Sequence, residues 1–362
     1  MFTIFVRMEE ERLEIEIKSL DMRKATQNDY AAYHEIRKDV RAYLFPDDPP
    51  MDDATFETLI ESRLEEGETI SYIAIDKEHH ENLVALARIY FLLEDSPSYE
   101  GNEHICRLSG PVVLPQYQRK GVAKKLLESI VKEALSRKMS VLVGSIFNEG
   151  GKEFLRKLGG KSALESREYR LELSDVDWSM VEEWQTDGKA CSPDAEIKFT
   201  TQIPESILER YCEVYTEVLN QAPRDELEVG DTVLTADRWR DDHQRFNKQG
   251  IVHLTAYILE STGDISGLTD VYYVPSMVPL LSQALTGVQE EYRGYGRGKW
   301  LKAAMLLEIK NRFQDVETIV TDNATSNEPM LAINERLGFK LSKEITSFQV
   351  EIPKVKQYLE MS

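Results

Sequence analysis

The sequence predicts two similar α+β domains in tandem, each with a mixed α/β sheet covered by helices. Three observations support this fold class. The chain has 362 residues, which is longer than a single hydrophobic core usually supports. Segments that resemble strands alternate with segments of helical periodicity. The same order of segments, with one short pattern at its centre, occurs in both halves.

The internal repeat decides the domain organisation. The stretch "VVLPQYQRKGVAKKLL" (112–127) aligns with "GVQEEYRGYGRGKWLK" (287–302), so that Gly121 falls on Gly296, 175 residues later. Further along, "FLRKLGGK" (154–161) aligns with "INERLGFK" (333–340) at an offset of 179 residues. We therefore expect an N-terminal domain over 13–174, a connecting linker over 175–194 and a C-terminal domain over 195–356.

The elements around the repeat follow the same order in each half. Residues 70–75, 83–92 and 107–114 are expected to be strands in the first half, followed by a strand at 141–147. Between the strands at 107–114 and 141–147, apolar residues recur at helical spacing and predict a helix with one buried face. These residues are Val122, Leu126, Leu127, Ile130, Val131 and Leu135. In the second half we expect a strand at 281–288, a helix at 298–313 and a strand at 316–321.

Composition excludes several functional classes. The chain has 64 acidic and 44 basic residues, a formal net charge of −20, which argues against general nucleic-acid binding because that needs a basic face. This charge is compatible with a cationic substrate and equally with a simple solubility role. No run of about 18 apolar residues predicts a membrane span, and the start "MFTIFVRMEEER" lacks the layout of a signal peptide. We expect a cytoplasmic protein that binds no membrane.

The three cysteines, Cys106, Cys191 and Cys212, lie far apart without a C-x-x-C spacing. Neither a disulfide framework nor a zinc site has this pattern. We therefore predict that the protein needs no metal.

A glycine-containing loop lies between a predicted strand and a predicted helix in each half. The first N–H groups of a helix are unpaired and favour anions, and glycine lets a ligand approach the backbone. Residues 293–302 and 116–125 each contain four bases and no acid. Both loops therefore predict a site for a small anion such as a phosphate, although glycines that serve only the turn remain the alternative. The spacing is that of neither a P-loop nor a dinucleotide fingerprint.

The two loops resemble the [RQ]-x-x-G-x-[GA] pyrophosphate loop of the GNAT superfamily of N-acyltransferases. Gln118-x-x-Gly121-x-Ala123 carries the motif in one half, and Arg293-x-x-Gly296-x-Gly298 in the other. A second family feature, an Asn seven residues before a Tyr that precedes L-G-F, is partly present. The resemblance covers about 13–353 and is similar to tandem members such as the mycothiol synthases. It implies two tandem GNAT-like acyl-CoA N-acyltransferase domains.

The resemblance also implies a site. Acyl-CoA would lie in a cleft between two parallel strands that splay apart, with its pyrophosphate on the loop backbone and its thioester carbonyl polarised near the strand end. The implied co-substrate is acetyl-CoA or another acyl-CoA. The implied residues that bind it are Val288, Arg293, Gly294, Tyr295, Gly296, Arg297, Gly298, Lys299 and Asn327 in the second half and Val113, Gln118, Arg119, Lys120, Gly121, Val122, Ala123 and Lys124 in the first.

The sequence departs from the family at the acid and the base. The Tyr that protonates the leaving thiolate in many members is Asn334 in one half and Leu155 in the other, and neither can act as a general acid. The Glu that serves as base in mycothiol synthases would fall near Ser282 or Gln283, or near Cys106 or Arg107. We predict Asn327, Asn334 and Gln283 as catalytic candidates. The alternative bases are Glu290, Asp270, Asp322 and Tyr273.

The second half has the fuller motif, so we expect it to be catalytic and the first half to bind cofactor weakly or to support the fold. The predicted function is an acyl-CoA-dependent N-acetyltransferase, in which the primary amine of a small molecule attacks directly in a ternary complex. The alternative is an acyl-CoA-binding sensor or scaffold without catalysis. Segments 44–59 and 221–239, rich in acids, lie where the family builds its acceptor site. They fit loops that receive a cationic amine and equally solvated loops.

Overall fold

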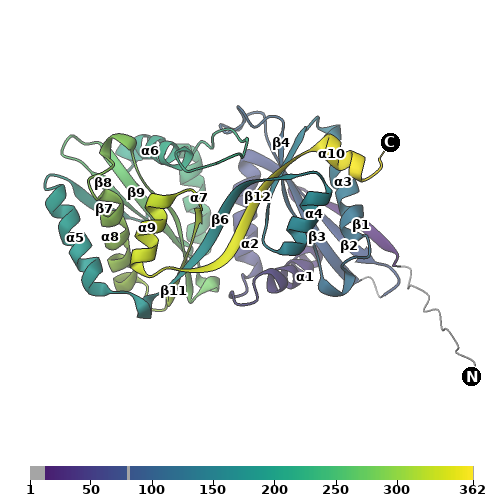
Figure 1. The fold of residues 1–362 in the computed structure, drawn as a ribbon, viewed down its shortest axis with the longest axis horizontal. Coiled ribbons are helices and arrows are strands. Elements are labelled where there is room, and N and C mark those ends of the chain that lie inside the picture. The colour runs from purple at the N-terminus through teal and green to yellow at the C-terminus, as the bar shows by residue number, and fades with distance from the viewer. Residues whose placement is uncertain (1–12, 80–81, 362) are drawn as a thin grey trace, which may run out of the picture.

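The computed structural model describes residues 13–79 and 82–361. Their strands form one sheet in the order β1-β2-β3-β4-β5-β12-β6-β11-β10-β9-β8-β7. Helices cover both faces, and the two halves of the chain lie side by side along the sheet (Figure 1). The predicted α+β class with two tandem domains is confirmed.

The same strands and helices occur in the same order in each half, except that the second half adds α5 before them and α10 after them. The first half contains β1 (Ile15–Asp21), α1 (Gln27–Leu44), α2 (Asp53–Glu66), β2 (Gly67–Asp76), β3 (Asn82–Leu92), β4 (Ile105–Val113), α3 (Val122–Ser136), β5 (Val141–Ile146), α4 (Glu149–Lys157) and β6 (Lys161–Glu172). The second half contains α5 (Trp178–Cys191), β7 (Glu196–Thr200), α6 (Leu208–Asn220), α7 (Ala236–Lys248), β8 (Val252–Leu259), β9 (Ile265–Tyr273), β10 (Leu280–Val288), α8 (Arg297–Arg312), β11 (Thr318–Ala324), α9 (Glu328–Leu337), β12 (Lys340–Glu351) and α10 (Ile352–Tyr358).

The last strand of each half belongs to the sheet of the other half. Strand β12 pairs with β5 of the first half, with Phe348 opposite Gly144. Strand β6 pairs with β11 of the second half, with Tyr169 opposite Thr321. The two exchanged strands also pair with each other and cross the middle of the molecule in Figure 1. Each half therefore needs a strand from the other to complete its sheet.

The segment expected to be a linker is mostly helical. Residues 175–194 contain α5, capped by the Asp177 side chain, which accepts a hydrogen bond from Met180 N. Helix α5 packs on α8, and its Val181 and Trp184 are buried in the C-terminal core. The segment joins the halves as a packed helix. Apolar residues at helical spacing, Val181 and Trp184 among them, could have predicted this helix. The linker was predicted instead from the polar residues and glycine of the segment.

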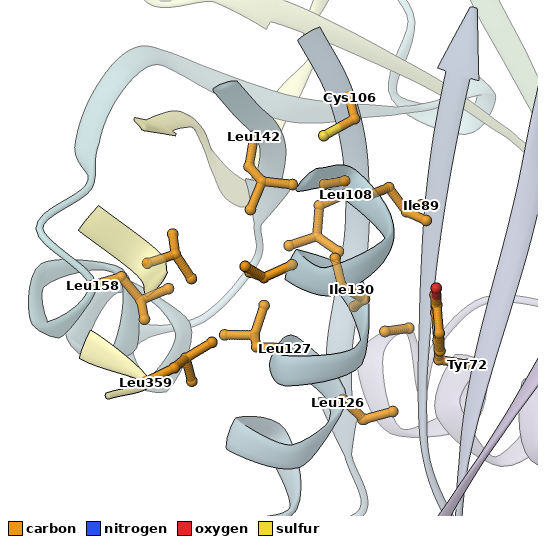
Figure 2. Packing of buried hydrophobic residues seen from close by; sticks show 14 of the residues in the cluster. Tyr72, Ile89, Cys106, Leu108, Leu126, Leu127, Ile130, Leu142, Leu158 and Leu359 are labelled. Atoms are coloured by element: carbon orange, nitrogen blue, oxygen red, sulfur yellow. The ribbon is translucent and has the colours of Figure 1, made fainter. Parts of the chain in front are cut away.

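The N-terminal core forms where α3 lies on the sheet. Leu126, Leu127 and Ile130 are fully buried. In Figure 2, Ile130 lies near Leu108 and Ile89 of the sheet, and Leu127 is directed toward Leu158 and Leu359. The predicted buried face of this helix is thus confirmed, except that Leu135 is 39% exposed. The buried face fixes α3 so that its first turn lies just beyond the end of β4.

Among residues 13–79 and 82–361, no helix is long and apolar enough to cross a membrane.

Candidate active site

In each half, two parallel strands separate at their carboxyl ends. Strand β4 pairs with β5 over Ile105–Leu108 and then runs on to Val113 without it. Strand β10 pairs with β11 over Leu280–Ser282 and runs on to Val288. Each of these strands also shifts register against its other neighbour at the point of separation. The splayed strands that the resemblance implied are therefore present in both halves.

Each splayed strand leads through a tight turn into a helix. A glycine with left-handed backbone precedes the first helical residue, Gly121 (φ 84°) before α3 and Gly296 (φ 79°) before α8. Neither helix start is capped by a described side chain, so the first N–H groups are free for another partner. A Cβ atom added at Gly121, Gly294 or Gly296 would meet no described atom within 4 Å. The space above both loops fits a ligand that touches the backbone, such as a pyrophosphate.

The loops differ at one strained position. Gly294 has a φ of 85°, and the matching residue of the first half, Arg119, has a φ of 62°. A residue with a side chain is uncommon in this left-handed region. The N-terminal loop therefore keeps the same backbone path at a conformational cost that Gly294 avoids.

The first residue of each motif closes the loop. Gln118 Nε2 donates to Val113 O at 2.9 Å, and Arg293 Nε donates to Val288 O at 3.0 Å. The two halves thus use an amide and a guanidinium for one contact, back to the end of the preceding strand. From the sequence, both residues were predicted to bind the pyrophosphate. In the structure, the side chain of each holds the loop in place through its hydrogen bond to the end of the strand.

Most of the bases near the C-terminal loop are engaged elsewhere. Arg297 is 9% exposed and forms an ion pair with Glu260, Nη2 to Oε1 at 2.9 Å. Lys299 Nζ lies 5.5 Å from the centre of the Trp184 ring. In the N-terminal loop, Lys120 is exposed. Arg119 is exposed as well, and its ion pair with Glu153 is long, at 3.7 Å. The count of bases in the sequence therefore overstated the positive charge available at the C-terminal loop.

The asparagines of the second family feature begin helices. Asn327 accepts a hydrogen bond from Met330 N at 3.4 Å at the start of α9. In the first half, the matching Asn148, seven residues before Leu155, accepts one from Gly151 N at 2.8 Å at the start of α4. Asn334 is 1% exposed, and its Nδ2 donates to Asn323 Oδ1 at 2.7 Å. Capping and buried packing therefore account for these side chains, and a catalytic role for Asn327 and Asn334 stays a prediction.

Gln283 binds a buried lysine. Gln283 Oε1 accepts a hydrogen bond from Lys302 Nζ at 2.5 Å, and Gln283 Nε2 donates to Thr269 Oγ1 at 3.2 Å. Lys302 is 2% exposed, and burial lowers its pKa to about 7. The repeat places Leu108 and Leu127 at these positions in the first half, both in the core. Gln283 thus faces α8, and its predicted catalytic role has no support from this contact.

Comparison with known proteins agrees with this geometry. Residues 31–159 match the family model described as "Acetyltransferase (GNAT) family". A tandem GNAT protein from the clavulanic acid biosynthesis pathway is similar in structure, with a TM-score of 0.71 and 17% identity, over 94% of this chain and 99% of that one. The chain is a tandem protein of the GNAT fold.

Other solved structures also resemble this chain. A GCN5-related N-acetyltransferase from Sphaerobacter thermophilus has a TM-score of 0.61 at 14% identity, over 93% of this chain and 96% of that one. A putative acetyltransferase from Pyrococcus horikoshii has a TM-score of 0.52 at 14% identity, over 95% and 93%. No curated protein matches the sequence. The fold and the family match support an acyltransferase, and the family match lies in the N-terminal half.

Asp322 lies at the open end of the C-terminal splay. It is two residues beyond the last β11 residue that pairs with β10, and its side chain is exposed. Desolvation by the surrounding chain, together with the negative charge of Glu168 opposite it on β6, raises the pKa of Asp322 to about 6, against the opposing effect of Lys343. Strand pairing places Ser145 at the matching position of the N-terminal half. An ionisable group at the splay is thus a feature of the second half.

The other three candidate bases lie in less suitable places. Tyr273 donates to Asp315 Oδ2 at 2.8 Å, and Glu290 is exposed in the turn that follows β10. Asp270 is fully buried and accepts hydrogen bonds from Leu285 N, Tyr215 OH and His253 Nε2. Asp322 is therefore the best placed of the four.

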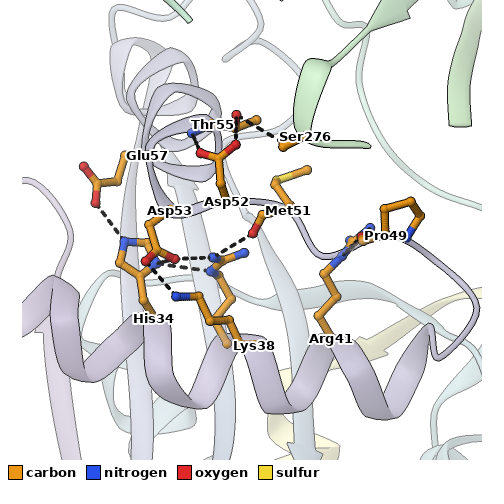
Figure 3. A network of polar contacts seen from close by, with 11 residues as sticks. His34, Lys38, Arg41, Pro49, Met51, Asp52, Asp53, Thr55, Glu57 and Ser276 are labelled. Atoms are coloured by element: carbon orange, nitrogen blue, oxygen red, sulfur yellow. Dashed lines mark hydrogen bonds and ion pairs between the residues drawn. The ribbon is translucent and has the colours of Figure 1, made fainter. Parts of the chain in front are cut away.

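Most acids of segment 44–59 already have partners in the structure. Half of this expected loop is helix α2, which Asp52 caps through Thr55 N. Asp53 accepts hydrogen bonds from Arg37 and Lys38, both at 2.7 Å. Figure 3 shows the contact between Lys38 and Asp53. In segment 221–239, Asp231 pairs with Arg224 at 2.8 Å, and α7 begins at Ala236. The paired acids of both segments are therefore not free to receive a cationic amine.

A cavity of about 160 Å³ lies in the second half, between α6, α7 and strands β8 and β9. Aromatic and imidazole side chains form much of its wall, namely Tyr215, Trp239, His243, Phe246, His253 and Tyr272. The sequence did not indicate the two histidines, because only the strand pairing and the helix packing bring them together. No group of three or more His, Cys, Asp or Glu residues suited to a metal occurs in the parts of the chain that the structure describes.

Proposed function

We propose that this protein is an acyl-CoA-dependent N-acyltransferase that transfers acetyl from acetyl-CoA to the primary amine of a small molecule, and that the C-terminal half carries the reaction. The open glycine loop at the end of a splayed strand carries the proposal, because it offers unpaired backbone N–H groups where a pyrophosphate would lie. The family match supports acyl transfer in general. The choice of half depends on Gly294 and Asp322, which the N-terminal half replaces.

The residues around the splay suit direct attack on a thioester. A backbone N–H near Val288 would stabilise the negative charge that develops on the carbonyl oxygen. Asp322, with a pKa of about 6, is largely deprotonated at neutral pH and can accept a proton from the attacking nitrogen. The C–S bond then breaks, and the CoA sulfur takes a proton from water, since a thiol has an ordinary pKa of about 8.5.

Calorimetric titration with acetyl-CoA tests the site. We expect wild-type protein and Gly250→Glu to bind, and Gly296→Glu to lose binding, because a carboxylate in the loop blocks and repels the pyrophosphate. Gly250 is a matched control with a φ of 66° and no neighbour closer than 3.6 Å to an added Cβ. Gly121→Glu tests the N-terminal loop in the same way. Loss of binding in Gly121→Glu with full binding in Gly296→Glu would place the cofactor in the wrong half for this proposal.

Turnover separates the enzyme from a sensor. Release of free thiol is followed with a panel of small primary amines and saturating acetyl-CoA. We expect release that depends on amine and disappears in Gly296→Glu. Tight binding of acetyl-CoA without thiol release for any amine would favour the acyl-CoA-binding sensor or scaffold.

A further inference from the structure

We propose that the cavity beneath α6 and α7 holds a primary ammonium group of the acceptor, distant from the amine that is acetylated. This inference rests on the proposed function, and it adds a substrate class: acceptors with two amino groups. The cavity lies in the half to which we assign the reaction.

Two imidazole nitrogens in this cavity have no partner. His243 Nδ1 is 2.8 Å from Trp239 O, and a carbonyl can only accept, so Nδ1 carries the proton and Nε2 is a bare acceptor. His253 Nε2 is 2.7 Å from Asp270 Oδ2 and donates to it, so the free nitrogen is Nδ1, which is an acceptor in the neutral imidazole. Both bare nitrogens are buried without a hydrogen-bond partner among the described residues. The side chains are 9% and 4% exposed, so these atoms need a donor supplied from elsewhere.

The surrounding contacts hold both imidazoles in place. Besides His253, the Asp270 carboxylate accepts Leu285 N at 2.7 Å and Tyr215 OH at 3.1 Å, which locks its orientation. Burial, with the neighbouring His253 ring, lowers the pKa of His243 to about 4. His243 is therefore neutral near pH 7, and its free nitrogen stays an acceptor.

The walls favour a cation over a neutral donor. Tyr215, Trp239, Phe246 and Tyr272 surround the histidines with aromatic rings, which attract an ammonium group through their faces. The charged wall residues are already paired. Arg238 binds Glu66 of α2, and Asp242 lies 3.1 Å from Arg245. A primary ammonium has three N–H donors and can satisfy both bare nitrogens at once.

The position of the cavity sets the spacing of the two amines. Tyr272 of the wall pairs with Ser282 of β10, whose side chain is exposed beside the splay. His253 is on β8, two strands from β10, which corresponds to roughly 10 Å across the sheet. In the N-terminal half, Thr69 stands where His253 stands, opposite Tyr90 as His253 is opposite Tyr272. The second half alone carries this arrangement among the described residues.

Binding can be measured without acyl-CoA, which separates this inference from the proposed function. Protein labelled with 5-fluorotryptophan gives a ¹⁹F signal from Trp239 in the cavity wall, assigned with Trp239→Phe. We expect benzylamine, which is a primary ammonium near neutral pH, to shift this signal. A cavity of about 150 Å³ can hold a benzene ring, so the probe matches the volume of about 160 Å³. Benzyl alcohol should bind at least about tenfold more weakly, because it lacks the charge.

Two variants and one control test the assignment. His253→Leu removes one acceptor, and Val233→Trp fills the cavity while both histidines remain; each should weaken benzylamine at least about tenfold. His79→Leu is the control, because His79 forms a similar pair with Asp76 at 2.8 Å but is 44% exposed. Benzylamine that leaves Trp239 unshifted, or binds His253→Leu and Val233→Trp like wild type, would overturn the site. Equal binding of benzyl alcohol would overturn the ammonium assignment.

A kinetic comparison tests the substrate class. In thiol-release assays, 1,6-diaminohexane should have a KM at least about tenfold below that of hexylamine for wild type, and Val233→Trp should abolish the difference. Equal KM values for wild type with normal turnover would overturn this inference and leave the proposed function intact. Failure of acetyl-CoA to bind, with benzylamine still at Trp239, would overturn the proposed function alone.

Discussion

Replacing the buried Lys302–Gln283 pair by leucines should stabilise the protein and remove part of its pH dependence. The N-terminal half shows that the change is sterically reasonable, because Leu108 and Leu127 occupy the matching positions in its core. Gln283→Leu alone leaves Lys302 without its hydrogen-bond acceptor and should be destabilising. The double variant Gln283→Leu/Lys302→Leu removes both polar groups together.

The magnitude follows from the pKa of Lys302. It is about 7 in the folded protein and close to 10.4 in an unfolded chain. Between these values the unfolded chain binds more protons at this site, so the free energy of unfolding rises with pH. At up to 1.36 kcal/mol per pH unit, this site raises the stability of wild type by about 2 kcal/mol from pH 7 to 9. The double variant should lack this rise and should exceed wild type most clearly at pH 7.

Urea unfolding at pH 7, 8 and 9 measures the effect, with far-UV circular dichroism and tryptophan fluorescence as two probes. Coincident curves from the two probes justify the free energies. Other groups that titrate in this range are common to both proteins, so the difference between their slopes reports Lys302. An unchanged slope in the double variant, or a double variant less stable than wild type at pH 7, would refute the reasoning.

Two further predictions concern the splay and the exchanged strand. If Asp322 is the base, kcat/KM of wild type should fall as the pH drops below about 6. The variant Asp322→Asn should lower kcat/KM about 10²-fold or more, and its kcat/KM should no longer fall with pH in this range. The control Ser145→Ala should behave as wild type. A wild-type profile for Asp322→Asn would exclude this base. Phe348→Ala should reduce the free energy of unfolding by about 3–5 kcal/mol, because Phe348 is 5% exposed in the N-terminal core. Leu341→Ala on the same strand, at 52% exposure, should change it by about 0.5 kcal/mol at most; comparable losses in urea unfolding would contradict this picture.

The sequence predicted the parts of the fold that depend on local chemistry. The turns before α3 and α8 need a residue with left-handed backbone, and the glycines at 121 and 296 allowed the sequence to predict both turns. The buried face of α3 followed from apolar spacing alone. The repeat then placed both loops at equivalent positions, which a single glycine-rich stretch could not have done.

The parts that were missed depend on contacts between distant segments. Glu260 neutralises Arg297 from the end of β8, 37 residues away, and a count of charges within the loop cannot include it. Lys302 was counted among the bases of the loop, whereas it is buried against Gln283, a position that a lysine seldom takes. The strand exchange also has no local signature, since β6 and β12 would have the same alternation of residues whichever sheet they joined.

The exchange of β6 and β12 fixes when this protein can finish folding during synthesis. Domains commonly fold as units, the N-terminal one first, while the ribosome is still at work. Here β5 pairs on one side with β12, whose residues Lys340–Glu351 leave the ribosome long after β5 itself. Until then the nascent N-terminal half presents an uncovered strand edge, a template for unwanted pairing. We therefore expect the two halves to mature together, and neither to be separable at the gene level into an independent product.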